Sequence, residues 1–350
     1  MAKKKILLIG FGGTIAMIVD EATKSIIPAK DIHEILDMVP IIKDLADISF
    51  VDLENLDSTN VNPTHWTKLA IFIMEKYEEY DGFVITHGTN TMSYTASALS
   101  IALGRGLKKP VIITGSQLPL VLCGTDARFN LENSVKVALK AIEEGIAEVM
   151  LVFSDVILRG CRAVKVSESD FRAFQSPAIG PIGFIKSTGI FFTSDALHVK
   201  SEIPFECHPH FESGILTVDL TPGQSPSLIR EVLRSGTCKG VILKSHGAGS
   251  VPSIGEYSFL PLIKDAVTTY KVPMMVSTKF LGGNSYKEIN DAPAVEALRA
   301  GAIPTGDMTD VMSEVKLMWL LKRGFHDRKG LCEEIGKSYV GEVTPFKVSL

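Results

Sequence analysis

Two threonines, Thr14 and Thr89, each come shortly after a short apolar run and directly after a glycine. The runs, residues 6–9 and 83–85, have the length and composition of buried strands. Ligands of open parallel sheets bind beyond the carboxyl ends of the strands, so the two hydroxyls are expected in one crevice. The pair predicts a nucleophile and a helper, although either threonine alone is more typical of a turn.

Other side chains near these threonines allow several interpretations. His87 is a candidate base, but a histidine between a strand and a glycine is more often a packed residue. Backbone N–H groups at the start of the helix expected after Thr89 can bind a carboxylate or an oxyanion. Asn90 or Thr91 can alternatively act as a cap of that helix. Lys165, taken alone, is typical of a solvated lysine.

Alternating strand-like and helix-like runs in the N-terminal part must position these residues. Such alternation predicts βαβ units, a mostly parallel sheet and helices on both of its faces. The predicted strands are residues 4–9, 48–53, 83–86, 110–114 and 148–154. The predicted helices are residues 31–38, 64–79, 92–106 and 126–144, the last with Asp126 as its cap.

A stretch rich in proline, histidine and polar residues interrupts this alternation at residues 192–213 and predicts a connector between domains. The predicted fold is therefore α/β, with a larger N-terminal domain at residues 1–191 and a smaller C-terminal α/β domain at residues 214–350. Within the smaller domain we expect strands at 240–243 and 272–277 and helices at 255–270, 293–301 and 309–322.

The composition excludes several classes of protein. The chain has 350 residues, 45% of them hydrophobic and 22% charged, and a net charge of −4. It has no basic excess for binding nucleic acid and no apolar stretch long enough to span a membrane. The apolar run at residues 6–9 is too short for a signal peptide, so a cytoplasmic location is expected.

The cysteines do not suggest a disulfide framework or a metal site. There are five, an odd number, scattered without a C-x-x-C pair, which favours reduced thiols. Cys207, His208 and His210 lie close together, but the intervening Pro209 favours a surface loop over a metal site.

Taken together, the motifs resemble the bacterial-type L-asparaginases, and the order and spacing point to the cytoplasmic type I branch. The resemblance extends along nearly the whole chain. It rests on residues 12–16 (GGTIA), 57–59 (DST), 86–89 (THGT), 91–92 (TM), 114–119 (TGSQLP), 159–160 (RG) with Lys165, and 306–309 (GDMT).

The resemblance implies a role for each matched residue. Thr14 matches the nucleophile that attacks the side-chain amide and forms a β-aspartyl ester. Thr89, with Lys165, matches the pair that activates water or moves the proton. Ser58 and Thr59 match positions that hold the substrate α-carboxylate, and Ser116 lies in a further matched segment with a substrate-binding role.

The resemblance also implies hydrolysis of L-asparagine to L-aspartate and ammonia without a cofactor or metal. It implies a homodimer or a dimer of dimers, with each site between the N-terminal domain of one subunit and the C-terminal domain of its partner.

Two positions depart from the family pattern. Asn90 stands where the family has an aspartate that binds the substrate α-ammonium and belongs to the Thr–Lys–Asp relay. Loss of that charge-assisted contact is expected to weaken binding by about 1.5–3 kcal/mol. Ile26 stands where relatives carry a tyrosine that orients the nucleophile, a role that Tyr286 is a candidate to fill.

Two alternative functions remain at this point. Asn90 and Ile26 are also consistent with a nearly inactive amino-acid-binding protein on an asparaginase scaffold. The threonine motifs are shared with the amidase subunit that supplies ammonia for transamidation of glutamyl-tRNA. That subunit carries an N-terminal extension, for which the position of Thr14 leaves no room, so this alternative is disfavoured.

Overall fold

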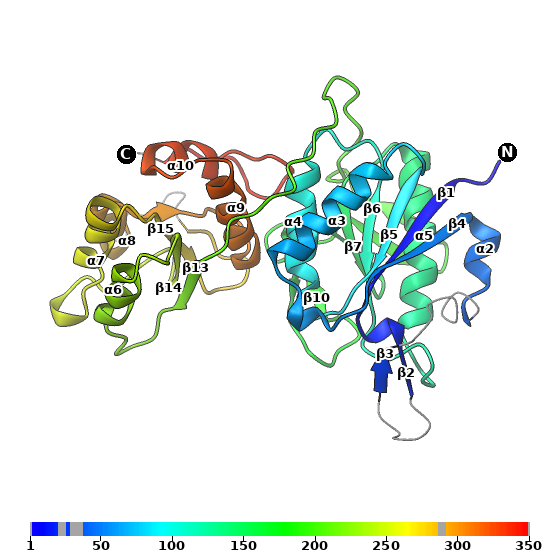
Figure 1. The fold of residues 1–350 in the computed structure, drawn as a ribbon, viewed down its shortest axis with the longest axis horizontal. Coiled ribbons are helices and arrows are strands. Elements are labelled where there is room, and N and C mark those ends of the chain that lie inside the picture. The colour runs from blue at the N-terminus through cyan, green and yellow to red at the C-terminus, as the bar shows by residue number, and fades with distance from the viewer. Residues whose placement is uncertain (1, 20–25, 29–37, 286–291, 349–350) are drawn as a thin grey trace. The chain divides into compact units, whose positions relative to one another are not determined.

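The chain folds into two compact units, Met1–Pro209 and His210–Leu350 (Figure 1). The computed structural model describes residues 2–19, 26–28, 38–285 and 292–348. The division falls within the predicted connector at residues 192–213, and the part of that connector up to Pro209 belongs to the first unit.

An eight-stranded sheet forms the centre of the first unit. Its strands are β1 (Lys5–Phe11), β4 (Asp47–Glu54), β5 (Gly82–Thr86), β6 (Val111–Thr114), β7 (Val149–Phe153), β8 (Val156–Arg159), β11 (Gly183–Lys186) and β12 (Gly189–Phe192). Their order is β12-β11-β8-β7-β6-β5-β1-β4. The strands from β7 to β4 are parallel, whereas β8, β11 and β12 extend the sheet in antiparallel pairs.

Helices cover both faces of this sheet (Figure 1). On one face lie α3 (Pro63–Glu75) and α4 (Met92–Leu103), and on the other lie α2 (Ile41–Leu45) and α5 (Ala127–Glu144). Because both faces are covered, the central strands are apolar at successive positions and not only at alternate ones.

Shorter elements carry several of the polar residues singled out above. Single turns of 3-10 helix follow β1, β4 and β8: η1 (Thr14–Ala16), η2 (Ser58–Asn60) and η3 (Gly160–Arg162). Two small antiparallel pairs lie outside the main sheet. They are β2 (Met17–Val19) with β3 (Ile26–Pro28), and β9 (Val164–Lys165) with β10 (Phe174–Gln175).

The second unit is a smaller α/β layer structure. Its strands β13 (Ile215–Asp219), β14 (Gly240–Ser245), β15 (Met274–Thr278) and β16 (Ile303–Pro304) form one parallel sheet. Its helices are α6 (Pro226–Arg234), α7 (Leu260–Asp265), α8 (Ala292–Ala300), α9 (Asp310–Lys322) and α10 (Arg328–Ile335). Figure 1 shows α9 on one face of this sheet and α6 to α8 on the other.

The predicted α/β fold, with a larger and mostly parallel N-terminal sheet, is confirmed. The helix predicted over residues 255–270 is confirmed only in its second part, where α7 continues directly into a π-helical turn at Ala266–Tyr270. Its predicted first part is wrong. A 3-10 turn at Gly255–Tyr257 precedes α7, whose first turn contains Pro261. Proline suits the first turn of a helix but interrupts its interior, so the helix starts there and not at residue 255.

Some elements have no clear signal in the sequence. The patterns of apolar residues did not predict β8, β11, β12 or β13. The helix expected at residues 31–38 falls almost wholly outside the described residues. Among the helices that the structure describes, none is both long and apolar enough to cross a bilayer.

Candidate active site

The turns that carry the two threonines lie at one edge of the main sheet. Thr14 follows β1, Thr89 follows β5, and Ser58 follows β4. Because β1 pairs in parallel with both β4 and β5, the carboxyl ends of these three strands adjoin. The predicted convergence of the three hydroxyl-bearing turns therefore follows from the strand order.

Two glycines allow these turns to touch. A Cβ on Gly13 would lie 2.2 Å from the amide nitrogen of Gly88, and a Cβ on Gly88 would lie 2.6 Å from Ser58 Oγ. Gly13 also has a φ of 87°, which L side chains rarely adopt. Glycine at both positions lets the backbones of residues 13 and 88 meet and the Ser58 side chain pack against Gly88. These contacts set the positions of Thr14, Ser58 and Thr89.

Lys165 joins this edge from β9. Its Nζ donates to Thr89 Oγ1 at 2.8 Å and to Asn90 Oδ1 at 3.0 Å. Thr89 is buried, and Lys165 is half-buried. Burial lowers the pKa of Lys165 below its ordinary value, while the charge of Glu168 acts in the opposite direction. The lysine therefore lies within proton-transfer distance of the Thr89 hydroxyl.

Asn90 connects Lys165 with the turn after β4. Its Nδ2 donates to Thr59 Oγ1 at 3.3 Å. The Asp57 carboxylate accepts the Thr59 backbone N–H at 2.7 Å and also the Thr59 hydroxyl, and these two bonds lower the pKa of Asp57. These hydrogen bonds form a chain of donors with a single direction: Lys165 donates to Asn90, Asn90 to Thr59, and Thr59 to Asp57.

Ser116 lies in the turn after β6, next to the other three turns. A Cβ on Gly115 would lie 2.3 Å from the carbonyl oxygen of His87, so this turn also packs closely against the β5 turn. Ser116 itself is buried, and its Oγ donates to the carbonyl oxygen of Leu118 at 2.7 Å. Its hydroxyl is therefore used within its own turn.

Gln117 is a positioning residue that the reading of the sequence did not single out. Its Nε2 donates to the carbonyl oxygens of Glu168 at 3.0 Å and Asp170 at 2.9 Å. These bonds tie the turn after β6 to the loop that follows Lys165. The available signal was its place beside Ser116 in a matched motif.

His87 is a packed residue and not a base. It is fully buried and stacks on Phe11 with ring centroids 5.5 Å apart. Its Nδ1 lies 2.7 Å from the carbonyl oxygen of Gly88, which can only accept, so Nδ1 carries the proton. Nε2 then accepts the Thr95 hydroxyl at 2.8 Å. Burial lowers the pKa of His87 to about 4, so the ring is neutral near pH 7.

Thr91 and Asp126 occupy the N-cap positions of α4 and α5, but neither side chain makes a cap bond. Thr91 is the N-cap residue of α4 by position, but its hydroxyl donates to the carbonyl oxygen of Ser58 at 2.6 Å and makes no cap bond. The Asp126 carboxylate likewise makes no cap bond to α5 and accepts the backbone N–H groups of Gln117 and Leu118. Both side chains bond instead to turns at the candidate site, the Ser58 turn for Thr91 and the turn after β6 for Asp126. Tertiary hydrogen bonds therefore replace the local cap bonds.

The side chains of the two residues discussed in connection with the missing tyrosine are not described by the structure. Ile26 lies in β3, but its side chain is not among those described, and Tyr286 lies outside the described residues.

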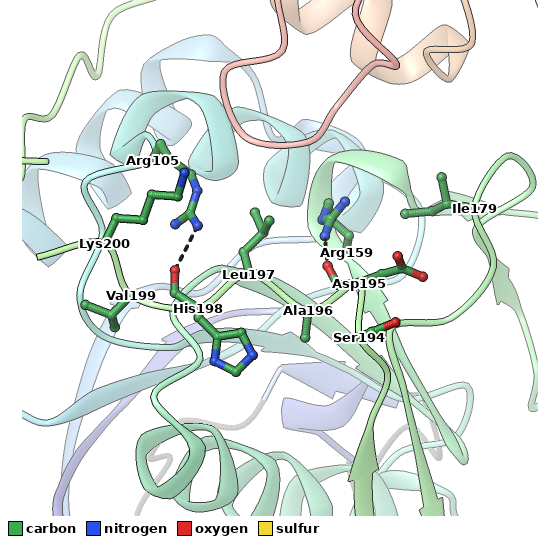
Figure 2. A pocket seen from close by; sticks show the side chains of 10 residues that line it. All are labelled: Arg105, Arg159, Ile179, Ser194, Asp195, Ala196, Leu197, His198, Val199 and Lys200. Atoms are coloured by element: carbon green, nitrogen blue, oxygen red, sulfur yellow. Dashed lines mark hydrogen bonds between the residues drawn. The ribbon is translucent and has the colours of Figure 1, made fainter. Parts of the chain in front are cut away.

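A second polar cluster lies at the opposite end of the strands (Figure 2). Arg159 pairs in register with Met150, at the start of β7. Its Nε donates to buried Glu148 at 2.8 Å, and Figure 2 shows its guanidinium also reaching the carbonyl oxygen of Asp195. Arg105 Nη2 donates to the carbonyl oxygen of His198 at 2.8 Å.

These bonds tie residues 195–198 to the sheet. Glu148 Oε1 also accepts the Leu197 backbone N–H at 2.7 Å, so both of its oxygens are used. The hollow beside them has a volume of about 740 Å³ and is lined by residues 194–200 together with Arg105, Arg159 and Ile179. Arg159 and Glu148 satisfy each other, whereas Arg105 Nη1 is buried without a hydrogen-bond partner among the described residues. The bonds that these side chains do make anchor the returning chain.

Among the residues that the structure describes, no three His, Cys, Asp or Glu side chains gather as a metal site. Cys207 is half-buried, and burial raises its pKa to about 11, so it is a thiol near pH 7.

Substitution of Gly13 tests the close packing of the turns. Gly13→Ala is expected to lower the free energy of unfolding by about 3 kcal/mol or more, because its Cβ would overlap the Gly88 backbone. Gly145→Ala is the matched control, since Gly145 has a φ of 67° but no heavy atom within 4 Å of its Cβ. It should lose only about 1 kcal/mol. Equal losses in urea unfolding would contradict the packing argument.

The buried neutral His87 predicts a particular pH dependence. The unfolded imidazole, with a pKa of 6.5, binds a proton that the folded one, with a pKa of about 4, does not. Stability should therefore fall as pH drops from 7 to 4.5, by about 2.5 kcal/mol from this group. The difference in unfolding free energy between wild type and His87→Gln should shrink over this interval. A difference that stays constant with pH would show that His87 does not titrate in this way.

The chain matches family models and known proteins along most of its length. The family model "Asparaginase, N-terminal" matches residues 5–198, and "Glutaminase/Asparaginase C-terminal domain" matches residues 215–332. L-asparaginase of Thermococcus kodakarensis is 34% identical over 97% of this chain and 99% of its own length. A glutamyl-tRNA(Gln) amidotransferase subunit of Pyrococcus furiosus is 33% identical over 97% of this chain and 77% of its own length.

Solved structures give the same result. The thermostable L-asparaginase from Thermococcus kodakarensis superimposes with a TM-score of 0.86 at 32% identity, covering 98% of this chain and 100% of that one. L-asparaginase I from Vibrio cholerae gives a TM-score of 0.85 at 30% identity, with coverage of 98% and 100%. The two family models together match residues of both units, and the relatives match nearly the whole chain. This chain therefore belongs to the asparaginase family, among type I members.

Proposed function

We propose that this protein is an amidohydrolase that converts L-asparagine to L-aspartate and ammonia, with Thr14 as the nucleophile. The observation that carries the proposal is the 2.8 Å hydrogen bond from Lys165 Nζ to the buried Thr89 hydroxyl. A lysine with a lowered pKa beside a hydroxyl, at the edge where the Thr14 turn lies, is suited to moving protons.

The proposed reaction has two stages. Thr14 Oγ attacks the amide carbon, the C–N bond breaks, and ammonia leaves with the proton from the attacking hydroxyl. Water then adds to the resulting ester while Thr89 and Lys165 take its proton. The ester C–O bond breaks, the proton passes to Thr14 Oγ, and aspartate is released. Backbone N–H groups of the turns at Thr14 and Thr89 are the proposed donors to the oxyanion.

Ser58 and Thr59 are the proposed partners of the substrate α-carboxylate, and Ser116 supports them from the neighbouring turn. Asn90 is neutral, so it offers no charge to a substrate ammonium. We therefore expect turnover of L-asparagine to be weak for this family. The homodimer or dimer of dimers implied by the resemblance stays a prediction.

The purified chain alone should release ammonia from L-asparagine in a coupled assay. Thr14→Ala should lower kcat by a factor on the order of 10³ or more, because no other hydroxyl replaces the nucleophile. Thr268→Ala, an exposed threonine of the second unit whose hydroxyl bonds only the backbone of Lys264, is the control and should be unchanged. A kcat for Thr14→Ala equal to that of wild type would refute the assignment of the nucleophile.

The pH dependence of the reaction tests the role of Lys165. A base must be neutral to accept a proton, so kcat should rise with pH through the lowered pKa of Lys165. Asn90→Asp would put a negative charge where Asn90 Oδ1 now lies, 3.0 Å from Lys165 Nζ. It should move this rise to higher pH by about one unit. A rise at the same pH in both proteins would exclude Lys165 as the titrating group.

Asn90 also favours a second candidate, an amino-acid-binding protein with little or no turnover. Calorimetry with L-asparagine and L-aspartate distinguishes the two. Tight binding without ammonia release in wild type supports the binding protein, whereas rapid ammonia release excludes it. Activity of the chain without any partner would also separate it from an amidase that supplies ammonia to a transamidation complex, the alternative that the Pyrococcus furiosus relative represents.

A further inference from the structure

The orientation of the Asn90 amide is determined by its neighbours. The Lys165 ammonium can only donate, so the atom 3.0 Å from it must be the amide oxygen, Oδ1. The amide nitrogen therefore faces Thr59, to whose hydroxyl oxygen it donates at 3.3 Å. The opposite orientation would set two donors against each other.

This orientation leaves Asn90 poorly suited to a cation. A substrate ammonium would have to share Oδ1 with Lys165, which places two cationic groups on one neutral oxygen. An ionised carboxylate at this position would offset that repulsion, but an amide does not. On its other side Asn90 presents N–H groups, which bind acceptors and not an ammonium.

Among the described residues, the acceptors bonded around Asn90 and Thr59 are already engaged. The Thr59 oxygen already accepts from Asn90, and its hydrogen is donated to Asp57. The Asp57 carboxylate is engaged with the backbone and hydroxyl of Thr59, at the far end of the chain of donors. The carbonyl oxygen of Ser58 accepts the Thr91 hydroxyl.

In the proposed reaction, Asn90 lies between the reacting end of the site and the end that binds the α-carboxylate. Its two amide atoms span from Lys165, at the reacting end of the proposed site, to Thr59, at the proposed carboxylate-binding end. In a four-carbon β-amide the α-carbon is separated from the amide carbon by one methylene group. Whatever group the α-carbon carries is therefore presented to Asn90.

We propose that this site prefers monoamides of four-carbon dicarboxylic acids whose α-carbon carries no ammonium, such as succinamate or 2-hydroxysuccinamate. This inference rests on the proposed amidohydrolase function and specifies its substrate class. For succinamate, Thr14 Oγ forms an ester with the amide carbon as the C–N bond breaks and ammonia leaves. Water then cleaves the ester, so succinamate and water give succinate and ammonium.

The first test measures ammonia release from succinamate and L-asparagine, which differ only in the α-ammonium. In wild type, kcat/KM should be at least about tenfold higher for succinamate. Asn90→Asp restores the charge and should shift the ratio towards L-asparagine by about tenfold to a hundredfold. Asn60→Asp, at an exposed position of η2, adds the same charge outside the chain of donors and should leave the ratio unchanged.

The second test does not require turnover. Calorimetry should show that wild type binds succinate more tightly than L-aspartate and that Asn90→Asp reverses this order. A wild-type preference for L-asparagine and L-aspartate, no effect of Asn90→Asp on either ratio, or binding of neither product overturns the substrate class. Absence of ammonia release from every monoamide, in both proteins, would instead refute the amidohydrolase function, and the binding order alone would then decide the ligand preference.

Discussion

Close backbone contact between Gly13 and Gly88, with Ser58 against the second glycine, is the constraint on which the candidate site depends. Three parallel strands end at one edge of the sheet, but strand order alone leaves their turns several ångströms of freedom. The absence of a Cβ at both glycines removes that freedom, because the backbones touch directly. The hydroxyl-bearing residues next to these glycines then occupy set positions before any substrate arrives, which is what catalysis by positioned groups requires.

The polar groups at this edge form a directional network. Each donor in the chain from Lys165 to Asp57 satisfies the next acceptor, so the orientation of Asn90 is determined by its partners and not by its own preferences. A carboxylate in place of this amide would have the same shape but would pair with the lysine by charge. In the proposed reaction this difference would affect both proton transfer through Lys165 and recognition of the substrate's α-carbon, since Asn90 bonds both Lys165 and Thr59.

The sequence predicted much of the scaffold because its signals are local. The buried strands that lead to Thr14, Thr89 and Ser116 are apolar runs bounded by glycine or proline, and such runs are visible without any tertiary contact. Elements whose identity depends on partners were missed or wrong. The antiparallel strands β8, β11 and β12 have only four residues each, and residues 255–270 do not form one helix. Thr91 and Asp126 have the side chains of helix caps, but they bond to neighbouring turns instead.

Local pattern and motif order by themselves determined the α/β class, the family and the identities of the residues at the strand ends. They determined these because periodicity, glycine placement and side-chain chemistry are properties of short segments. Only the tertiary structure decided which groups touch: that Lys165 reaches Thr89 and Asn90, that His87 is buried and neutral, and that the Ser116 hydroxyl is used within its own turn. Hydrogen bonding, burial and the pKa values that follow from them depend on residues far apart in the chain, so no short segment contains them.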